Sequence, residues 1–402
     1  MEQISRLKNP VLEYEWGSFT DIPNLLGAKS PSKTPQAEMW LGAHPKAPSM
    51  VFVNGRWVSL EETIKKYPEN VLGRQTSVMF GGKLPYLFKV LAVLKPLSIQ
   101  VHPNLTQARQ GFLRENKQNI PLNASNRNYK DDNHKPECIC ALTSFYALNG
   151  FRHIPTIIEL LEKTCCKSLK DEYNILKYNQ NPSGLKKFFS QLITMDKNRQ
   201  KKVVYEAATN ALTYLTDDNL FEWVVRLNNE YPGDIGVLSP LLLNLVCLEP
   251  GQAMFLPSGE LHAYLSGMGI ELMANSDNVL RGGLTPKHVD VHELLNTLNF
   301  MEKNVNILVP AVKRKHEMVY ECGANEFILS VIHSVDGSEY VSPATRSAEI
   351  ILCVEGSARI KGSCKHDSIF IQKGESVVIP AYVHQYTIKG GAILYKASVP
   401  VQ

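Results

Sequence analysis

The chain has 402 residues, more than one ordinary hydrophobic core organises, so we expect two or three domains. Apolar residues make up 44% and charged residues 20%, as in a soluble globular protein. The net charge of +4, from 43 basic and 39 acidic side chains, argues against nucleic-acid binding and allows small anionic substrates. The chain has no apolar signal region and no apolar run of membrane-spanning length, so we predict a cytoplasmic protein without membrane contact.

The eight cysteines are scattered along a chain without a secretion signal, which indicates reduced and mostly buried thiols. The pair Cys138 and Cys140 could bind a metal, but no second pair stands at zinc-ribbon spacing. We therefore predict that this pair fills space in a core.

Short apolar runs interrupted by Gly, Pro and Asn cover the first 149 residues, a texture typical of strands and turns. We predict strands at residues 50–53 and 86–94. The pair Asn54-Gly55 predicts a β-hairpin, because both residues accept a positive φ at little steric cost. The run 37–45 carries Glu38 and His44, whose roles their position alone leaves open.

The run 97–103 is a predicted strand with an unusual polar face. Side chains alternate along a strand, so Ser98, Gln100 and His102 share one face while apolar residues take the other. Pro103 ends the strand because it offers no N–H. The run alone fits either a half-buried sheet edge or two ligands converging on one metal ion.

Between residues 155 and 232 apolar positions recur at spacings of three and four, which predicts helices. Pro155 suits a helix start, and Asp217 to Asn219 offers a cap before another helical run. We predict an all-helical insertion domain over residues 151–235, whose Lys-rich face is a solvated helix surface.

An internal repeat relates residues 251–264 to residues 374–386. Gly to Pro is six residues in both copies, Pro to His is five or four, and His to Tyr is two. A strand that opens at Gly, stops at Pro and resumes with His is typical of a cupin-type barrel, in which the histidine points inward.

We therefore predict a mainly β fold with two cupin-type (jelly-roll) barrels and an all-α domain. The catalytic barrel comprises residues 1–150 and 236–300. The C-terminal barrel comprises residues 315–402 and holds no metal, because no motif like the run 97–103 precedes His384, which we expect to be structural.

The repeat supplies His262, and the run His134 to Glu137 adds a carboxylate at a strand start, with Lys135 and Glu137 on one face. Each such residue alone is more often structural. Together with Gln100 and His102 they form a set of two imidazoles, a carboxylate and an amide that suits zinc with one position open.

The run 271–287 predicts a strand that enters a loop near the barrel mouth. Arg281 before a glycine pair and Lys287 after Pro286 are cations on constrained backbone, which suits phosphate binding. An ordinary salt-bridged loop is the alternative.

Four motifs in the same order, at residues 98–103, 134–137, 259–264 and 276–287, closely resemble those of type I mannose-6-phosphate isomerases, and the likeness extends from Tyr14 to the C-terminal barrel. The resemblance implies interconversion of mannose 6-phosphate and fructose 6-phosphate through an enediolate, with one zinc ion per chain. It implies Gln100, His102, Glu137 and His262 as ligands, Arg281 as catalytic residue and Ser98, Lys135 and Lys287 as substrate-site residues.

The reaction needs a group that transfers the proton, and the sequence leaves Glu271, Lys135, Asp277 and zinc-bound hydroxide open. Tyr264, on the strand face of His262, would line the pocket. We expect a monomer with a sugar phosphate as its partner. The rival functions are a non-catalytic hexose-phosphate-binding cupin and a metal-dependent cupin oxygenase, which prefers iron.

Overall fold

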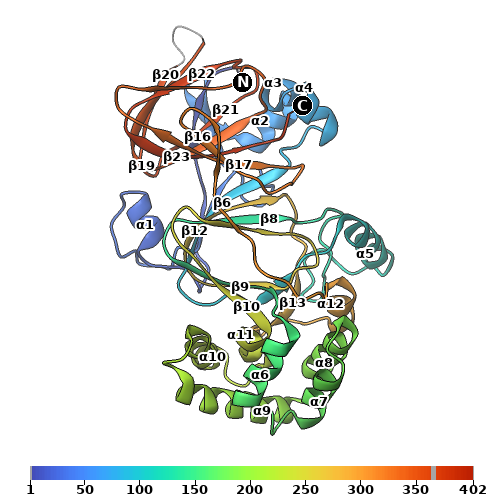
Figure 1. Cartoon of the computed structure of the whole chain (residues 1–402). Helices are drawn as coiled ribbons and strands as arrows, with labels where there is room; N and C mark the ends of the chain where they lie inside the picture. The colour runs from blue at the N-terminus through green and yellow to red at the C-terminus, as the bar shows by residue number, and fades with distance from the viewer. Residues whose placement is uncertain (1, 364–367, 402) are drawn as a thin grey trace.

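The structure is a computed structural model that describes residues 2–363 and 368–401 (Figure 1). It confirms the predicted fold class: the chain is mainly β, with a helical segment inserted between two strands. In Figure 1 the C-terminal barrel lies at the top, the catalytic barrel in the middle and the inserted helices at the bottom. Within the described residues no helix is long and apolar enough to cross a membrane, and the cytoplasmic location stays a prediction.

The catalytic barrel is built around β12, a strand of 13 residues. The first part of β12 pairs with β7 and β9, and the second part pairs with β6 and β8, so one strand joins both halves of an 11-stranded sheet. The strands are β2 (Val11–Leu12), β3 (Glu38–Leu41), β6 (Tyr86–Val93), β7 (Ile99–Val101), β8 (Glu137–Ala141), β9 (Phe145–Phe151), β10 (Leu243–Leu248), β11 (Ala253–Leu256), β12 (His262–Ala274), β13 (Leu280–Gly283) and β14 (Ile307–Leu308).

Two predictions for the first 149 residues need correction. The strand predicted at 97–103 is shorter, since only β7, residues Ile99–Val101, pairs with neighbours. The first 149 residues, which we predicted to hold strands and turns, also contain helices, of which α5 is the longest. They are α1 (Asp21–Leu25), α2 (Leu60–Lys66), α3 (Pro68–Leu72), α4 (Arg74–Met79) and α5 (Leu105–Lys117).

Six α-helices lie between β9 and β10; five of them, α6 to α10, make up the predicted helical run, and α11 belongs to the short segment that leads back to the sheet. Pro155 lies in the first turn of α6, and the Asp218 side chain caps α10 by accepting from the Leu220 N–H, both as predicted. The elements are α6 (Ile154–Thr164), α7 (Lys170–Tyr178), α8 (Pro182–Thr194), α9 (Lys197–Ala211), η1 (Leu212–Tyr214), α10 (Asn219–Glu230), η2 (Ile235–Leu238) and α11 (Ser239–Leu242); α12 (Val291–Thr297) follows β13.

The C-terminal barrel is a 12-stranded sheet that borrows strands from the N-terminus. β1 (Ser5–Lys8) pairs with β21 on one side and with β4 (Met50–Val53) on the other. The predicted hairpin is confirmed, since Asn54 and Gly55 have φ of 50° and 78° between β4 and β5 (Arg56–Ser59). The remaining strands are β15 (Ala311–Arg314), β16 (Glu317–Tyr320), β17 (Ile328–Ser334), β18 (Glu339–Val341), β19 (Glu349–Gly362), β20 (Ser368–Gln372), β21 (Ser376–Ile379), β22 (Tyr386–Lys389) and β23 (Ala392–Ser398).

The predicted division assigned residues 1–150 to the catalytic barrel together with 236–300, and residues 315–402 to the C-terminal barrel. It did not anticipate that N-terminal strands pair within the C-terminal sheet, and the domain boundaries stay a prediction. The two sheets pack on one shared apolar core, in which Phe88 and Ile270 meet Tyr395 and Ile350. The Tyr86 hydroxyl donates to the Ala397 carbonyl at 3.1 Å across this core. The two barrels therefore form one continuous packing unit.

A paired ionic network fills part of the interior of the C-terminal barrel. The Lys396 ammonium, 3% exposed, lies 2.6 Å from a Glu317 oxygen and 3.3 Å from a Glu349 oxygen. The Tyr340 hydroxyl donates to Glu317 at 3.0 Å. Lys396 lies between the two carboxylates, and Arg314 at 2.9 Å from Glu317 and Arg346 at 3.5 Å from Glu349 complete the balance of charge that burial requires.

Seven cysteines are free thiols, of which five, including Cys138 and Cys140, are buried, while Cys364 lies outside the described residues. His384 is exposed in the loop before β22, where its ring stacks on Tyr382 with centroids 6.4 Å apart. The predicted absence of metal from the C-terminal barrel stays a prediction.

Candidate metal centre and active site

Strand register gathers four polar side chains on one face of the catalytic barrel. Arg281 on β13 is opposite Gln100 on β7, and Gln100 is opposite His262 at the start of β12. His262 is in turn opposite Asn149 on β9. Directly opposed residues of antiparallel strands share a face, so this row spans four adjacent strands.

The imidazoles of His102 and His262 enclose the Glu137 carboxylate. Nε2 of His102 is 3.3 Å from one carboxylate oxygen, and Nε2 of His262 is 3.4 Å from the other. All three side chains are buried, and their possible ligand atoms lie within 4.8 Å of one another. The chain thus brings three potential metal ligands together from β8, β12 and the segment after β7.

Both imidazoles are held in the tautomer that a metal ligand needs. Nδ1–H of His102 donates to the Asn278 carbonyl at 2.7 Å, and Nδ1–H of His262 donates to the Glu260 carbonyl at 2.9 Å. Both Nε2 lone pairs therefore face Glu137. Burial also lowers the pKa of His102 to about 4, so its ring is neutral at ordinary pH.

This donor set fits a divalent cation. Nε2 of His102 is buried without a hydrogen-bond partner among the described residues, and a lone pair aimed at a carboxylate is unfavourable unless a cation lies between them. The Gln100 amide N–H donates to the Ser98 hydroxyl at 3.4 Å, which leaves its carbonyl oxygen free as a further ligand. Nitrogen and oxygen ligands of these types suit zinc.

Lys135 lies directly beside this metal centre. Its ammonium is 2.8 Å from the Glu137 carboxylate, as expected for two residues on one strand face. Burial raises the pKa of Glu137, but Lys135 and His102 outweigh burial and hold that pKa well below its usual value. Glu137 is therefore an anion.

A second buried polar group lies on the adjoining strands β3, β6 and β12. The Lys89 ammonium is 3.1 Å from Glu271 and 3.4 Å from Glu38, and it lies over the Trp40 ring. Burial raises the pKa of Glu271. The sequence predicted Glu271 as a site residue but missed Lys89, although a single lysine in the apolar run 86–94 was a usable signal.

Cations gather around Asp277 in the loop before β13. The Asp277 carboxylate is 2.7 Å from Lys46 and 3.6 Å from His44, and Lys46 holds the pKa of that carboxyl down against the effect of burial. Lys130 is close enough to Lys46, Arg281 and Lys287 for their charges to add to burial in lowering its pKa. This cationic rim suits a phosphate dianion, and the sequence missed Lys46 and Lys130 in it.

Comparison with known proteins decides the family. Profiles of the type I phosphomannose isomerase catalytic domain and helical insertion domain match residues 4–154 and 160–243, and that of the mannose-6-phosphate isomerase cupin domain matches 326–398. The Escherichia coli (strain K12) mannose-6-phosphate isomerase is 41% identical over 395 residues, which cover 96% of this chain and 97% of that protein. The chain belongs to the mannose-6-phosphate isomerase family. It is therefore an enzyme.

Solved structures of mannose-6-phosphate isomerases show the same fold. A mutant of the Salmonella typhimurium phosphomannose isomerase superposes with a TM-score of 0.92 at 37% identity, covering 99% of this chain and 100% of that one. A zinc-bound mannose 6-phosphate isomerase gives 0.89 at 36% identity, with the same coverage of 99% and 100%. The likeness thus includes both barrels and the inserted helices.

The predicted site residues lie at different degrees of burial in the structure. His102, Glu137 and His262 form the cluster that could hold a metal ion, with Gln100 opposite His262 and Lys135 beside Glu137. Tyr264 lies beside it, with its ring centroid 6.1 Å from that of His262 and its hydroxyl without a partner among the described residues.

Arg281 is half-buried, and its guanidinium forms no hydrogen bond or ion pair within residues 2–363 and 368–401. Lys287 is exposed at the mouth and makes no ion pair in the described part of the chain. These two cations are therefore free to meet a substrate.

Proposed function

We propose that this chain interconverts mannose 6-phosphate and fructose 6-phosphate, with one zinc ion held by Gln100, His102, Glu137 and His262. The observation that supports the proposal best is the pair of lone pairs on His102 and His262 aimed at the buried Glu137 carboxylate. Zinc bound there would act as a Lewis acid toward the sugar oxygens.

The chain's own residues supply the rest of the chemistry. The reaction moves a proton between two adjacent carbons, so charge develops on the sugar oxygens as an enediolate. Arg281, in register with Gln100, offers a planar fork of donors for that charge. Lys287 and the cations around Asp277 bind the phosphate.

The group that transfers the proton comes from a short set of candidates. Lys135, Glu271 and Asp277 stay in that set, as does zinc-bound hydroxide. Of the three side chains, Lys135 contacts a proposed metal ligand, while Glu271 and Asp277 are ion-paired with Lys89 and Lys46. Ser98 and Tyr264 line the sugar pocket in this proposal.

The proposed domain boundaries remain as predicted: residues 1–150 with 236–300 for the catalytic barrel, 151–235 for the helical insertion and 315–402 for the C-terminal barrel.

The test combines a coupled isomerase assay with measurement of bound zinc. We expect a chelator to abolish turnover, added zinc to restore it, and His262→Ala to lose both zinc and activity. His384→Ala is the matched control, because that histidine is exposed in the second copy of the repeat and should change neither.

Other outcomes would point to the rival functions. Saturable binding of mannose 6-phosphate without turnover would indicate a sugar-sensing cupin, and stoichiometric iron with oxygen consumption would indicate an oxygenase. Full activity in metal-free His262→Ala would rule out the metal centre proposed here.

A further inference from the structure

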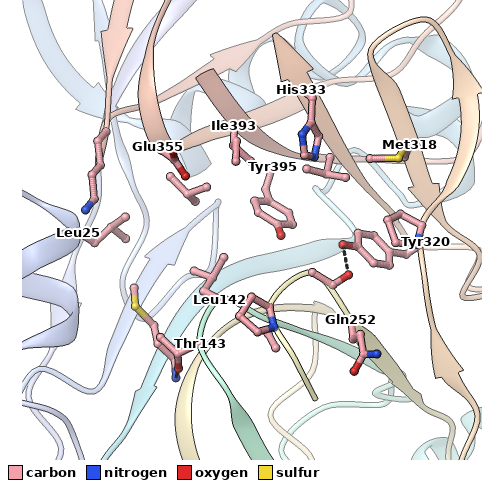
Figure 2. Close-up of a pocket in the computed structure, with 18 of the residues that line it drawn as sticks. Leu25, Leu142, Thr143, Gln252, Met318, Tyr320, His333, Glu355, Ile393 and Tyr395 are labelled. Atoms are coloured by element: carbon pink, nitrogen blue, oxygen red, sulfur yellow. Dashed lines mark hydrogen bonds between the residues drawn. The ribbon is translucent and has the colours of Figure 1, made fainter. Parts of the chain in front are cut away.

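A cavity lined by residues of both barrels lies away from the candidate metal centre (Figure 2). Its volume is about 690 Å³, within the range of small-molecule sites. Leu142 and Met268 line it from the catalytic barrel, and Met318, Ile393 and Tyr395 line it from the C-terminal barrel. In Figure 2 the Tyr395 ring lies near the middle of these apolar side chains. The centre of the cavity is therefore apolar.

Polar and charged groups surround this apolar centre. Asp21 and Glu355 contribute two carboxylates, and Lys373 contributes one ammonium. None of the three forms an ion pair in the part of the chain that the structure describes. The two carboxylates and the ammonium together give a net charge of −1, which repels dianions such as sugar phosphates and favours a positively charged guest.

The cavity is distinct from the active site but shares its strands. None of the proposed metal or substrate residues lines it. Met268 and Glu271 are three residues apart on β12, so they point to opposite faces of the sheet. Glu271 faces the interior of the catalytic barrel, and Met268 faces the core shared with the C-terminal barrel.

We propose that this cavity binds a small amphipathic organic cation, an apolar body of about ten carbon atoms that carries one amino group. The apolar body fills the space around Tyr395, and the ammonium group meets Glu355 and Asp21. The proposal is independent of the isomerase function, since it involves none of the residues assigned to that reaction.

The test uses three probes with one apolar body and different head groups: 4-phenylbutylamine, 4-phenylbutanol and 4-phenylbutyrate. Each is titrated into the full-length protein by calorimetry. We expect one saturable site for the amine and an affinity roughly tenfold higher for the amine than for the acid, because the two head groups differ in sign against a lining with one excess negative charge.

Three variants locate the binding. Ile393→Trp fills the cavity and should abolish binding of the amine. Val341→Trp is the matched control, because Val341 is 46% exposed on β18 of the same barrel, does not line the cavity and should leave binding unchanged. Glu355→Gln removes one carboxylate from an exposed position and should reduce the preference for the amine over the acid severalfold, even if Ile393→Trp folds poorly.

Four results would overturn the proposal. They are the absence of saturable binding by the amine, equal affinity for amine and acid, unchanged binding in a folded Ile393→Trp variant, and displacement of the amine by mannose 6-phosphate. The last result would place the probe in the active site. Thermal unfolding of Ile393→Trp and Val341→Trp beside the parent protein distinguishes a loss of binding from a loss of the native fold.

Discussion

Arg281 combines a half-buried position with a guanidinium that meets no other described side chain. Lysine would keep the charge but lose the fork of donors, so we predict that Arg281→Lys lowers kcat by roughly a hundredfold, the scale for loss of one preorganised donor. KM and zinc content should change much less, because the proposed ligands and phosphate contacts lie elsewhere. Steady-state kinetics and metal analysis beside the parent protein test this. A large rise in KM with kcat intact would make Arg281 a phosphate anchor instead.

For single residues, the sequence indicated His102, Glu137 and His262, which the structure brings together, better than the polar groups around them. Gln100, His102, Glu137 and His262 stand in short motifs where strand alternation or the repeat indicates their direction. Lys89 stands in no motif, and Asn278 stands in one that gave no sign of its role. Both roles arise only from contacts across the fold: Lys89 with Glu38 and Glu271, and Asn278 with His102. A pattern of neighbours in sequence cannot predict such long-range partners.

The strand β13 positions Arg281 through two glycines with different backbone requirements. Gly283 has φ of +136°, a region that side chains rarely adopt, and a Cβ there would lie 3.0 Å from the Gly236 Cα. Gly282 has no positive φ, and a Cβ there would come no closer than 3.3 Å to flexible side-chain carbons of Ile99 and Leu261. The two neighbours should therefore respond differently to substitution.

We predict that Gly283→Ala costs about 1–3 kcal/mol of stability, lowers the thermal midpoint by several degrees and reduces kcat by displacing Arg281. Gly282→Ala should change the thermal midpoint by only about a degree and keep most of the activity. Thermal unfolding and kinetics of the two variants side by side provide the measurement. Equal effects of both substitutions would contradict this account of β13.

Among the elements, the helices with a regular apolar spacing were predictable and those without it were not. The helices α6 and α10 follow apolar spacing and have recognisable starts at Pro155 and Asp218. The missed helix α5 also had a signal, since Asn104 and Gln107 form a capping box. Its face is weakly apolar, with only Ala108, Gly111 and Glu115 buried, so periodicity alone did not reveal it.

The C-terminal barrel is incomplete without the N-terminal strands. β1 covers the edge of β21, and the ion pair between Arg6 and Glu375 at 2.8 Å joins the same two regions. We predict that residues 311–402 expressed alone aggregate, because the uncovered β21 edge can pair with other chains. Supplying residues 1–59 on a separate chain should increase the soluble yield. A monomeric fragment with a cooperative unfolding transition would show that the barrel needs no borrowed strand.

The interior network of the C-terminal barrel makes its stability depend on pH. Burial raises the pKa of Glu317, but Lys396 and Tyr340 outweigh burial and hold it below the usual value of 4.5. The stabilising effect of this carboxylate is therefore present above that pH and is lost as the pH falls below it. We predict that Glu317→Gln lowers the thermal midpoint near neutral pH and that the difference from the parent shrinks as the pH falls below 4.5. Glu339→Gln, at a more exposed ion pair with Lys389, should give a small difference at every pH.

Lys396 and the proposed zinc ion neutralise buried carboxylates in two barrels of one chain, but only Lys396 is covalently part of that chain. The C-terminal barrel therefore has its counterion from the moment of synthesis, whatever the supply of metal. The catalytic barrel depends on an ion from its surroundings. A cell starved of zinc would then accumulate a folded but idle enzyme, ready to work as soon as an ion diffuses in, without renewed synthesis or refolding of the chain.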